Sequence, residues 1–521
     1  MRIIKEEKRD SFRISGIKNI AISVVVAILS FYSLMLIARR FGGSEGSDAY
    51  FFLLSITTLA TGLISSLFAT VFLPIFVELK IREGLTQACE FAGSILTWCL
   101  IIIFPLSIAA YLNYEDFYAL FSKFTHHQIL GLKFVLIYFA PILLISVLSE
   151  FFRTIVLALG YYTLAAIGAL FQPVFLLIAI VFFSSSLKEE SLALSLLIAK
   201  LVVLIFMFII VSKKEHFKIQ FLLKRNVATT KFVKVSAPYW GANVITNFAT
   251  FFFDYLATGL GAGVLTSISY AQKIFGLPIT LILNPVLEIA RTKFSESHAR
   301  KDRQTFVMHY NKLLQLVMYL TIPIAVLYYF IPVQIISVLF KKGAFSDQNV
   351  IISAACLKVF AFSIPFAALF MVNGRACESF QRLAWPSFFG TLGNFLLITT
   401  TFIFVGKMGY IGIPLARLSI DVLYFLPFGF IAIRLLAGKY HLSNFGTVCV
   451  TALIASLLPV IMFHYWGDYL HLITIYPSVW SLCLLLFCFM LAYLLLVSLI
   501  DRRVYSSAVE ILNNVAKKYL R

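Results

Sequence analysis

Long apolar stretches recur along the whole chain and alternate with short polar breaks. From Ile17 to Ile500, windows of about 20 mostly apolar residues are separated by basic or glycine-rich segments. A helix of that length crosses the roughly 30 Å hydrocarbon layer of a bilayer. The pattern therefore predicts an all-α polytopic membrane protein with about fourteen transmembrane helices. The predicted spans are residues 17–38, 51–78, 89–111, 134–157, 161–183, 190–212, 235–258, 263–289, 309–331, 350–373, 384–406, 409–436, 444–465 and 474–500.

Composition supports a membrane protein and argues against a soluble fold. Of the 521 residues, 61% are hydrophobic and 13% are charged, which leaves too little polar surface for a soluble protein of this size. The net charge of +19 could indicate a nucleic-acid partner. However, Lys and Arg concentrate in the breaks between spans, where the positive-inside rule explains them, so we expect no nucleic-acid binding. The seven scattered cysteines predict neither a disulfide framework nor a metal site.

The distribution of charge over the breaks predicts the orientation. Segments 213–234 and 290–312 are strongly basic, whereas breaks 184–189 and 259–262 are short and nearly neutral. The positive-inside rule places the basic breaks in the cytoplasm, and an even number of spans then puts both chain ends there. The polar N-terminal tail 1–16 has no small-residue cleavage signature, so we expect it to be retained.

The basic segments also suggest how the chain is divided. Six spans precede the linker, six follow it, and two remain, which predicts two six-helix lobes plus a C-terminal helix pair. The expected regions are an N-terminal lobe 1–212, a basic cytoplasmic linker 213–234, a C-terminal lobe 235–437, and a helix pair with a cytoplasmic tail 438–521.

Charged residues inside the spans are candidates for function, because a charge in the bilayer is costly unless it faces a partner or a cavity. Glu150 with Arg153, and Arg417 with Asp421, are spaced to pair locally on one helix face. Lys200 and Lys273 have no such neighbour, so pairing with a distant carboxylate and lining an aqueous cavity both stay open. Together with Lys358 they would attract an anion such as a diphosphate.

The eighth span is interrupted by Gly276, Pro278 and Pro285. Ordinary kinking explains such residues in most transmembrane helices, and a bending gate helix is the alternative here. The chain shows no catalytic motif, and its one close histidine pair, His126 and His127, is better explained as solvated, so we expect no enzymatic activity.

Three segments, 43–52, 269–278 and 337–346, resemble in order and spacing the motifs of the MurJ (MviN) lipid II flippases. That family belongs to the multidrug/oligosaccharidyl-lipid/polysaccharide exporter superfamily and also has fourteen spans. The resemblance implies a monomeric flippase in the bacterial inner membrane. It would move an undecaprenyl-diphosphate-linked saccharide to the outer leaflet by alternating access through a cationic cavity. It implies no cofactor, Na⁺ or the membrane potential as the driving force, and cell-wall synthesis enzymes as partners.

The resemblance also assigns residues to sites. Asp48 matches the acidic residue at the start of the second span, and Lys273 matches a substrate-site arginine of the eighth. Asp254 and Asn394 fall near positions that resemble a sodium site of some members. The chain departs from the family pattern in its first two spans: Ile20–Ala38 contains no charge, and Tyr50–Leu79 contains only Glu78, where the family has arginines.

These departures leave alternatives open. The cavity recruits Lys200, Lys358 or Arg417 in place of the missing arginines, or the substrate differs from lipid II. The alternative functions are an ion-coupled small-molecule or drug exporter of the same superfamily, for which twelve spans are expected, and a dedicated O-antigen or exopolysaccharide flippase. A glycan polymerase or ligase would need a large outer loop, and the longest outer break, 112–133, is short and lacks catalytic residues.

Overall fold

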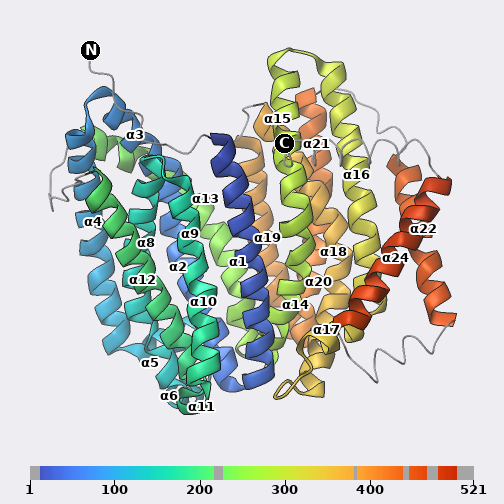
Figure 1. Ribbon diagram of the computed structural model, residues 1–521, viewed down its shortest axis with the longest axis horizontal. Helices are drawn as coiled ribbons and strands as arrows, with labels where there is room; N and C mark the ends of the chain where they lie inside the picture. Colours follow the sequence, from blue (N-terminus) through green and yellow to red (C-terminus); the bar gives the residue numbers. More distant parts are fainter. Residues whose placement is uncertain (1–11, 216–226, 381–383, 438–444, 466–478, 501–521) are drawn as a thin grey trace. The chain divides into compact units, whose positions relative to one another are not determined.

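The computed structural model describes residues 12–215, 227–380, 384–437, 445–465 and 479–500, and in these ranges the chain is helical throughout. Eleven helical segments in this part of the chain are long and apolar enough to cross a membrane. The all-α membrane architecture is therefore confirmed (Figure 1). The predicted linker 213–234 and the tails 1–16 and 501–521 lie partly or wholly outside the described residues.

The predicted count of fourteen spans is not confirmed. One of the eleven segments, Phe388–Ile431, contains two of the predicted spans. They form helices α19 (Ala384–Met408) and α20 (Gly412–Ile420), which pack against each other after a turn at Gly409, where φ is +59°. The predicted seventh span is helical but is not one of the eleven, and the thirteenth contains a shorter apolar helix, Phe445–Ile461.

The chain divides into two compact units, residues 1–265 and 266–521. In the first unit α8 packs against α12 and α2 against α13, and a cluster of phenylalanines packs η1 and α3 against α4 and α8. Its elements are α1 (Phe12–Phe41), α2 (Glu45–Leu67), η1 (Phe68–Phe72), α3 (Leu73–Arg82), α4 (Leu85–Leu112), α5 (Tyr114–Phe121), α6 (His126–Gly131), α7 (Lys133–Leu136), α8 (Phe139–Ala158), α9 (Tyr162–Ile167), η2 (Gly168–Leu170), α10 (Phe171–Ile178), η3 (Ala179–Phe183), α11 (Ser184–Leu187), α12 (Glu190–Glu215) and α13 (Val227–Ala257).

In the second unit α16 packs between α18 and α22, and α22 packs against α24. The last two helices lie where the sequence predicts a C-terminal pair. The elements are α14 (Val264–Pro278), η4 (Ile279–Leu283), α15 (Asn284–Ala299), α16 (Arg303–Phe330), α17 (Pro332–Phe340), α18 (Asp347–Ser379), α19, η5 (Gly409–Ile411), α20, η6 (Asp421–Phe425), α21 (Leu426–Ala437), α22 (Phe445–Tyr465) and α24 (Val479–Ile500).

Several of these helices have side-chain caps at their N-termini. Ser346 and Thr125 each form a reciprocal capping box, which satisfies backbone N–H groups that have no partner within the helix. Asp302 caps α16 by accepting hydrogen bonds from the hydroxyl and the backbone N–H of Thr305, and these bonds lower the pKa of its carboxyl. The caps define where the helices begin on the water-exposed side of the spans.

The outer surfaces of both units carry large apolar side chains. Ile28 and Phe182 in the first unit, and Leu423 and Phe487 in the second, each expose more than half of their surface. In water such a surface would cause aggregation, whereas in a bilayer it faces lipid tails that are equally apolar.

Candidate functional site

The first motif holds the start of α2 in place. Asp48 lies in the first turn of α2, and its carboxylate is almost fully buried. It accepts a 2.6 Å hydrogen bond from the backbone N–H of Gly263, which adopts a positive φ of +77°. The structure therefore gives Asp48 a protein partner in the turn before α14. Its predicted place in the substrate site stays a prediction.

A second set of contacts surrounds the start of α2 and was not predicted from the sequence. Ser44, the N-cap of α2, donates a hydrogen bond to the Glu189 carboxylate, and the Glu45 carboxylate accepts one from Gln128, at 3.0 Å each. Gly46 lies directly against the Glu189 side chain, so any larger residue would clash with it. The Ser44 cap was the local signal available in the sequence, but Glu189 is 145 residues away and only the fold brings it there.

The second and third motifs form one packed cluster in the second unit. Tyr270 of α14 lies 4.6 Å from Phe340 and 5.3 Å from Phe345, measured between ring centroids, and all three rings are buried. Nearby, the Ser353 hydroxyl and the Asn349 side-chain amide of α18 donate hydrogen bonds to Ser267. Tyr270, Phe340 and Phe345 of the motifs, together with the flanking Ser267, Asn349 and Ser353, form a joint between α14, α17 and α18.

Three charged side chains meet inside the first unit. Glu150 and Arg153 of α8 form the expected ion pair, with Nη2 and Oε2 2.7 Å apart. Lys200 of the adjacent α12 is partly buried and interacts electrostatically with both of them. Glu150 is thus a distant carboxylate that attracts Lys200 across the packing of α8 against α12. Two cations share one carboxylate, so the group carries a surplus positive charge when all three are ionised.

Lys273 and Lys358 are the other predicted cations, and both are exposed in the second unit. Lys273 forms no ion pair or hydrogen bond with any residue that the structure describes. The Lys358 ammonium lies 4.7 Å from the centre of the Tyr329 ring, a cation–π contact that leaves its charge uncompensated. Both side chains can therefore offer a positive charge to an external anion.

Arg417 and Asp421 form the expected local pair in the second unit. Arg417 Nε donates to Asp421 Oδ2 at 2.9 Å. The arginine side chain is 31% exposed, whereas the aspartate side chain is only 1% exposed. The guanidinium is thus accessible from outside the helix packing, and the carboxylate is not.

The predicted ion-site residues lie in different units. Asp254 of α13 is half-buried and accepts a 2.6 Å hydrogen bond from the Ser55 hydroxyl of α2. Asn394 lies on α19 and is also half-buried. An ion site that uses both residues stays a prediction.

The second unit contains an ion-pair network that sequence analysis missed. Arg375 of α18 contacts Glu288 of α15 at 2.7 Å and Glu378 at 3.1 Å, and Arg291 contacts Glu378 at 3.4 Å. Glu288 and Arg291 lie on α15, whereas Arg375 and Glu378 lie on α18, more than 80 positions later in the sequence. Spacing along one helix could therefore not reveal the contacts between them. It ties the end of the eighth span to the end of the tenth.

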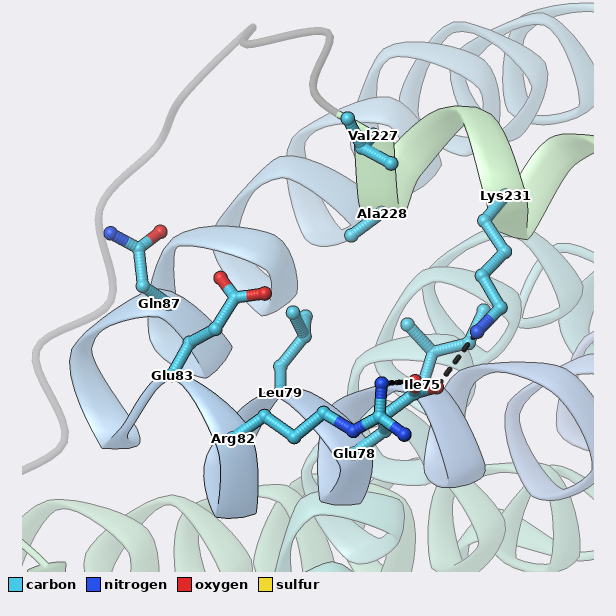
Figure 2. A pocket seen from close by; sticks show the side chains of 9 residues that line it. All are labelled: Ile75, Glu78, Leu79, Arg82, Glu83, Gln87, Val227, Ala228 and Lys231. Carbon is cyan, nitrogen blue, oxygen red and sulfur yellow. Dashed lines mark hydrogen bonds and ion pairs between the residues drawn. The ribbon is translucent and has the colours of Figure 1, made fainter.

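Figure 2 shows a pocket of about 320 Å³ in the first unit, between the end of α3 and the start of α13. Glu78 lines this pocket and pairs with Lys231 at 2.7 Å and with Arg82 at 3.2 Å. Its lining residues are Ile75, Glu78, Leu79, Arg82, Glu83, Gln87, Val227, Ala228 and Lys231. Its two carboxylates, Glu78 and Glu83, balance its two cations, Arg82 and Lys231, so this pocket offers no surplus positive charge to an anion.

Each unit therefore contains lysines beyond its paired arginines. In the first unit Glu150 is paired with Arg153, and Lys200 is the additional cation. In the second unit Asp421 is paired with Arg417, and Lys273 and Lys358 are additional. A lysine ammonium can bind a phosphate group by charge and hydrogen bonding, without any covalent step, and a joint substrate site of these residues stays a prediction.

Comparisons with known proteins extend over most of the chain. A sequence model of the family described as "Lipid II flippase MurJ" matches residues 37–478. A "Probable lipid II flippase MurJ" of Aquifex aeolicus is 27% identical over 429 residues, covering 78% of this chain and 82% of that protein. A protein of the same description from Buchnera aphidicola subsp. Schizaphis graminum is 23% identical, covering 72% of this chain and 74% of that one.

Solved structures show the same fold. The structure titled "Lipid II flippase MurJ, inward closed conformation" aligns with a TM-score of 0.78 at 21% identity, covering 93% of this chain and 98% of that chain. An inward-facing multidrug resistance MATE family transporter of the MOP superfamily aligns with a TM-score of 0.67 at 13% identity, covering 81% and 99%. At these identities the structural matches establish the fold alone.

Proposed function

Because the chain belongs to the lipid II flippase MurJ family, we propose that it moves a polyprenyl-diphosphate-linked saccharide from the inner to the outer leaflet. The substrate is lipid II or a related precursor of cell-wall or envelope glycans. The observation that carries the proposal is the family match over residues 37–478. The surplus of cations within the spans supports it, since the diphosphate is the charged part of such a substrate.

The proposed mechanism is alternating access without chemistry on the substrate. Lys273, Lys200, Lys358 and Arg417 attract the diphosphate and lower the cost of moving its charge through the bilayer. No bond is broken, so the chain acts as a transporter and has no enzymatic role. Lysine is a point charge without the flat, two-pronged geometry of arginine, so Lys273 would bind a diphosphate less specifically than the family's arginine.

The driving force is proposed to be the membrane potential or a sodium gradient. A potential of 100 mV does about 2.3 kcal/mol of work on each elementary charge that crosses the membrane. Asp254 and Asn394 are the residues that we propose for a sodium ion. If transport continues unchanged when Na⁺ is replaced by K⁺, the sodium proposal is wrong and the potential alone must suffice.

We propose a bacterial inner-membrane location with both chain ends in the cytoplasm, because the positive-inside rule favours that side for the basic breaks. The chain is proposed to work as a monomer, and its basic cytoplasmic loops are proposed to meet cell-wall synthesis enzymes. Blue-native electrophoresis of the protein in nanodiscs measures the oligomeric state directly.

Two alternatives remain within the same superfamily. The fold shared with the MATE transporter is compatible with an ion-coupled small-molecule exporter. The charge-free stretch Ile20–Ala38 would suit a flippase for a different lipid-linked glycan, such as an O-antigen or exopolysaccharide precursor. The family match favours lipid II over both.

The decisive experiment is complementation of a MurJ-depleted bacterium, with lipid II accessibility in the outer leaflet measured on the same cells. Growth with restored accessibility would establish lipid II as a substrate. Folded protein in the membrane without growth or accessibility would mean that another lipid-linked glycan is carried.

Lys273→Ala tests the cation that matches the family's substrate-site arginine. We expect it to reduce lipid II accessibility at least tenfold, because an unpaired, exposed ammonium would be lost from the transport path; a tenfold effect corresponds to about 1.4 kcal/mol. Lys407→Ala is the matched control, since Lys407 is an exposed lysine at the end of α19. Equal activity of the two variants at equal membrane abundance would remove Lys273 from the site.

A further inference from the structure

The buried carboxyl of Asp421 has two polar neighbours. Oδ2 accepts the hydrogen bond from Arg417, and the Ser363 hydroxyl lies close enough to the carboxyl to hydrogen-bond with it. The residue is 0% exposed. A carboxylate without contact to water depends on such partners to keep its charge.

Ser363 of α18 provides a hydroxyl next to this carboxyl. The side chain is fully buried, and it neighbours Asp421 closely enough to act on its charge. A buried hydroxyl and a buried carboxyl therefore lie side by side.

Both helices are irregular at this place. Asp421 begins the π-helical turn η6, and Pro365 follows Ser363 by two positions within α18. A proline removes one backbone hydrogen bond, and π-turns within α-helices are frequent at functional sites. The irregular backbone makes it easier for the two helices to shift against each other at Asp421.

Arg417 is the charged group that acts on Asp421. The elements packed against η6 are α18, α19, α20 and α21. Among the described side chains, Arg417 from α20 and the Ser363 hydroxyl from α18 interact with the carboxyl, and the phenol of Tyr424 lies in the same π-turn. The other titratable groups on the described parts of these helices are Asp347, Cys356, Lys358, Arg375, Cys377, Glu378, Lys407 and Arg434.

We propose that Asp421 is a proton-binding site, and that its protonation releases Arg417 to bind the diphosphate of the transported lipid. Ser363 suits both protonation states, because a hydroxyl can donate to an ionised Oδ1 and can accept from a protonated one. The proton comes from solvent and forms one O–H bond on the carboxyl. The only interaction lost is the ion pair with Arg417.

The geometry separates the two ligands. The guanidinium is 31% exposed and can be reached by an anion, whereas the carboxyl is 1% exposed and can change its charge only by taking up a proton. The diphosphate and the Asp421 carboxylate thus compete for one guanidinium. By linkage, diphosphate binding promotes proton uptake, and acidification strengthens diphosphate binding by the same factor.

This inference rests on the proposed function for the identity of the anion, but its protonation step can be tested directly. The experiment is infrared difference spectroscopy of the full-length protein in nanodiscs, during a pH titration and on addition of undecaprenyl diphosphate. We expect a protonated-carboxyl band that Asp421→Asn removes and that Asp347→Asn, a change at an exposed carboxylate of the same helix bundle, leaves in place. Undecaprenyl diphosphate at fixed pH should increase the band, with uptake of about one proton per lipid bound.

Two further variants test the coupling. Arg417→Gln should abolish the response to undecaprenyl diphosphate, because the competition for the guanidinium is gone. Ser363→Ala keeps Asp421 and should shift the frequency of the band, because the hydrogen-bond partner is removed.

A band that persists in Asp421→Asn overturns the site, and a band that ignores undecaprenyl diphosphate overturns the coupling. A protein that shows both expected responses but fails the lipid II complementation instead contradicts the proposed substrate. The two failures are therefore distinguishable.

Discussion

The partners of the charged residues within the spans could be predicted from the sequence only in part. The spacings of Glu150–Arg153 and Arg417–Asp421 predicted local ion pairs, and both pairs are confirmed. The partner of Lys200 could not be predicted, because Glu150 lies 50 positions earlier and reaches Lys200 only through the packing of α8 against α12. Sequence spacing thus reveals neighbours on one helix, and the fold decides neighbours between helices.

Glu150 should stabilise the charged group that it forms with Arg153 and Lys200 in the first unit. Glu150→Gln would leave Arg153 and Lys200 as like charges without an anion between them. We expect a loss of about 2 kcal/mol of stability, seen as a lower apparent unfolding temperature of the protein in nanodiscs. Glu83→Gln is the control, because Glu83 is exposed beside the pocket of Figure 2 and forms no ion pair with a described residue. Equal unfolding temperatures for the two variants would show that Glu150 is dispensable.

At the scale of elements, hydrophobic periodicity located the helices well because a span must be long, apolar and internally hydrogen-bonded. The π-turns η1, η3, η4 and η6 were not predictable, since they arise where packing moves a helix by a fraction of a turn. The eighth span illustrates both cases: Pro278 and Pro285 marked an interruption, and the structure places η4 between them. Whether a span kinks can be read from its prolines, but the geometry of the kink depends on its neighbours.

The joint between the second and third motifs should contribute more to stability than apolar residues that face lipid. Phe340 is fully buried against Tyr270, whereas Phe330 at the end of α16 is 46% exposed. Phe340→Ala should cost about 3 kcal/mol because it leaves a cavity between packed helices, and Phe330→Ala should cost little. The apparent unfolding temperatures of the two variants in the same lipid provide the comparison. A larger loss for Phe330→Ala would mean that the motif serves another purpose than packing.

At the scale of the whole molecule, the chain divides into two compact units. The first unit ends at Leu265, after α13, whereas the C-terminal lobe suggested by the sequence begins at residue 235, within that helix. The basic linker marks a change of membrane side, but it says nothing about which helices pack together. The side chains of α13 pack on α2, as the Ser55–Asp254 hydrogen bond shows, and this contact groups α13 with the first unit. The predicted lobe boundaries stay a prediction.

The orientation of the whole chain leads to the last prediction. Several basic breaks each favour the same orientation of the chain, with these breaks in the cytoplasm. The orientation should therefore not change when a single charged residue is replaced. Alkaline phosphatase inserted at Gly131, an open position in the break 112–133, should be active because this break is expected outside. The same reporter placed after Lys213 should be inactive, because the basic linker is expected inside. Activity at both positions would contradict the three spans that are predicted between them. Reversed activities would mean that the basic breaks do not set the orientation, and the direction of the proposed transport would then have to be reversed as well.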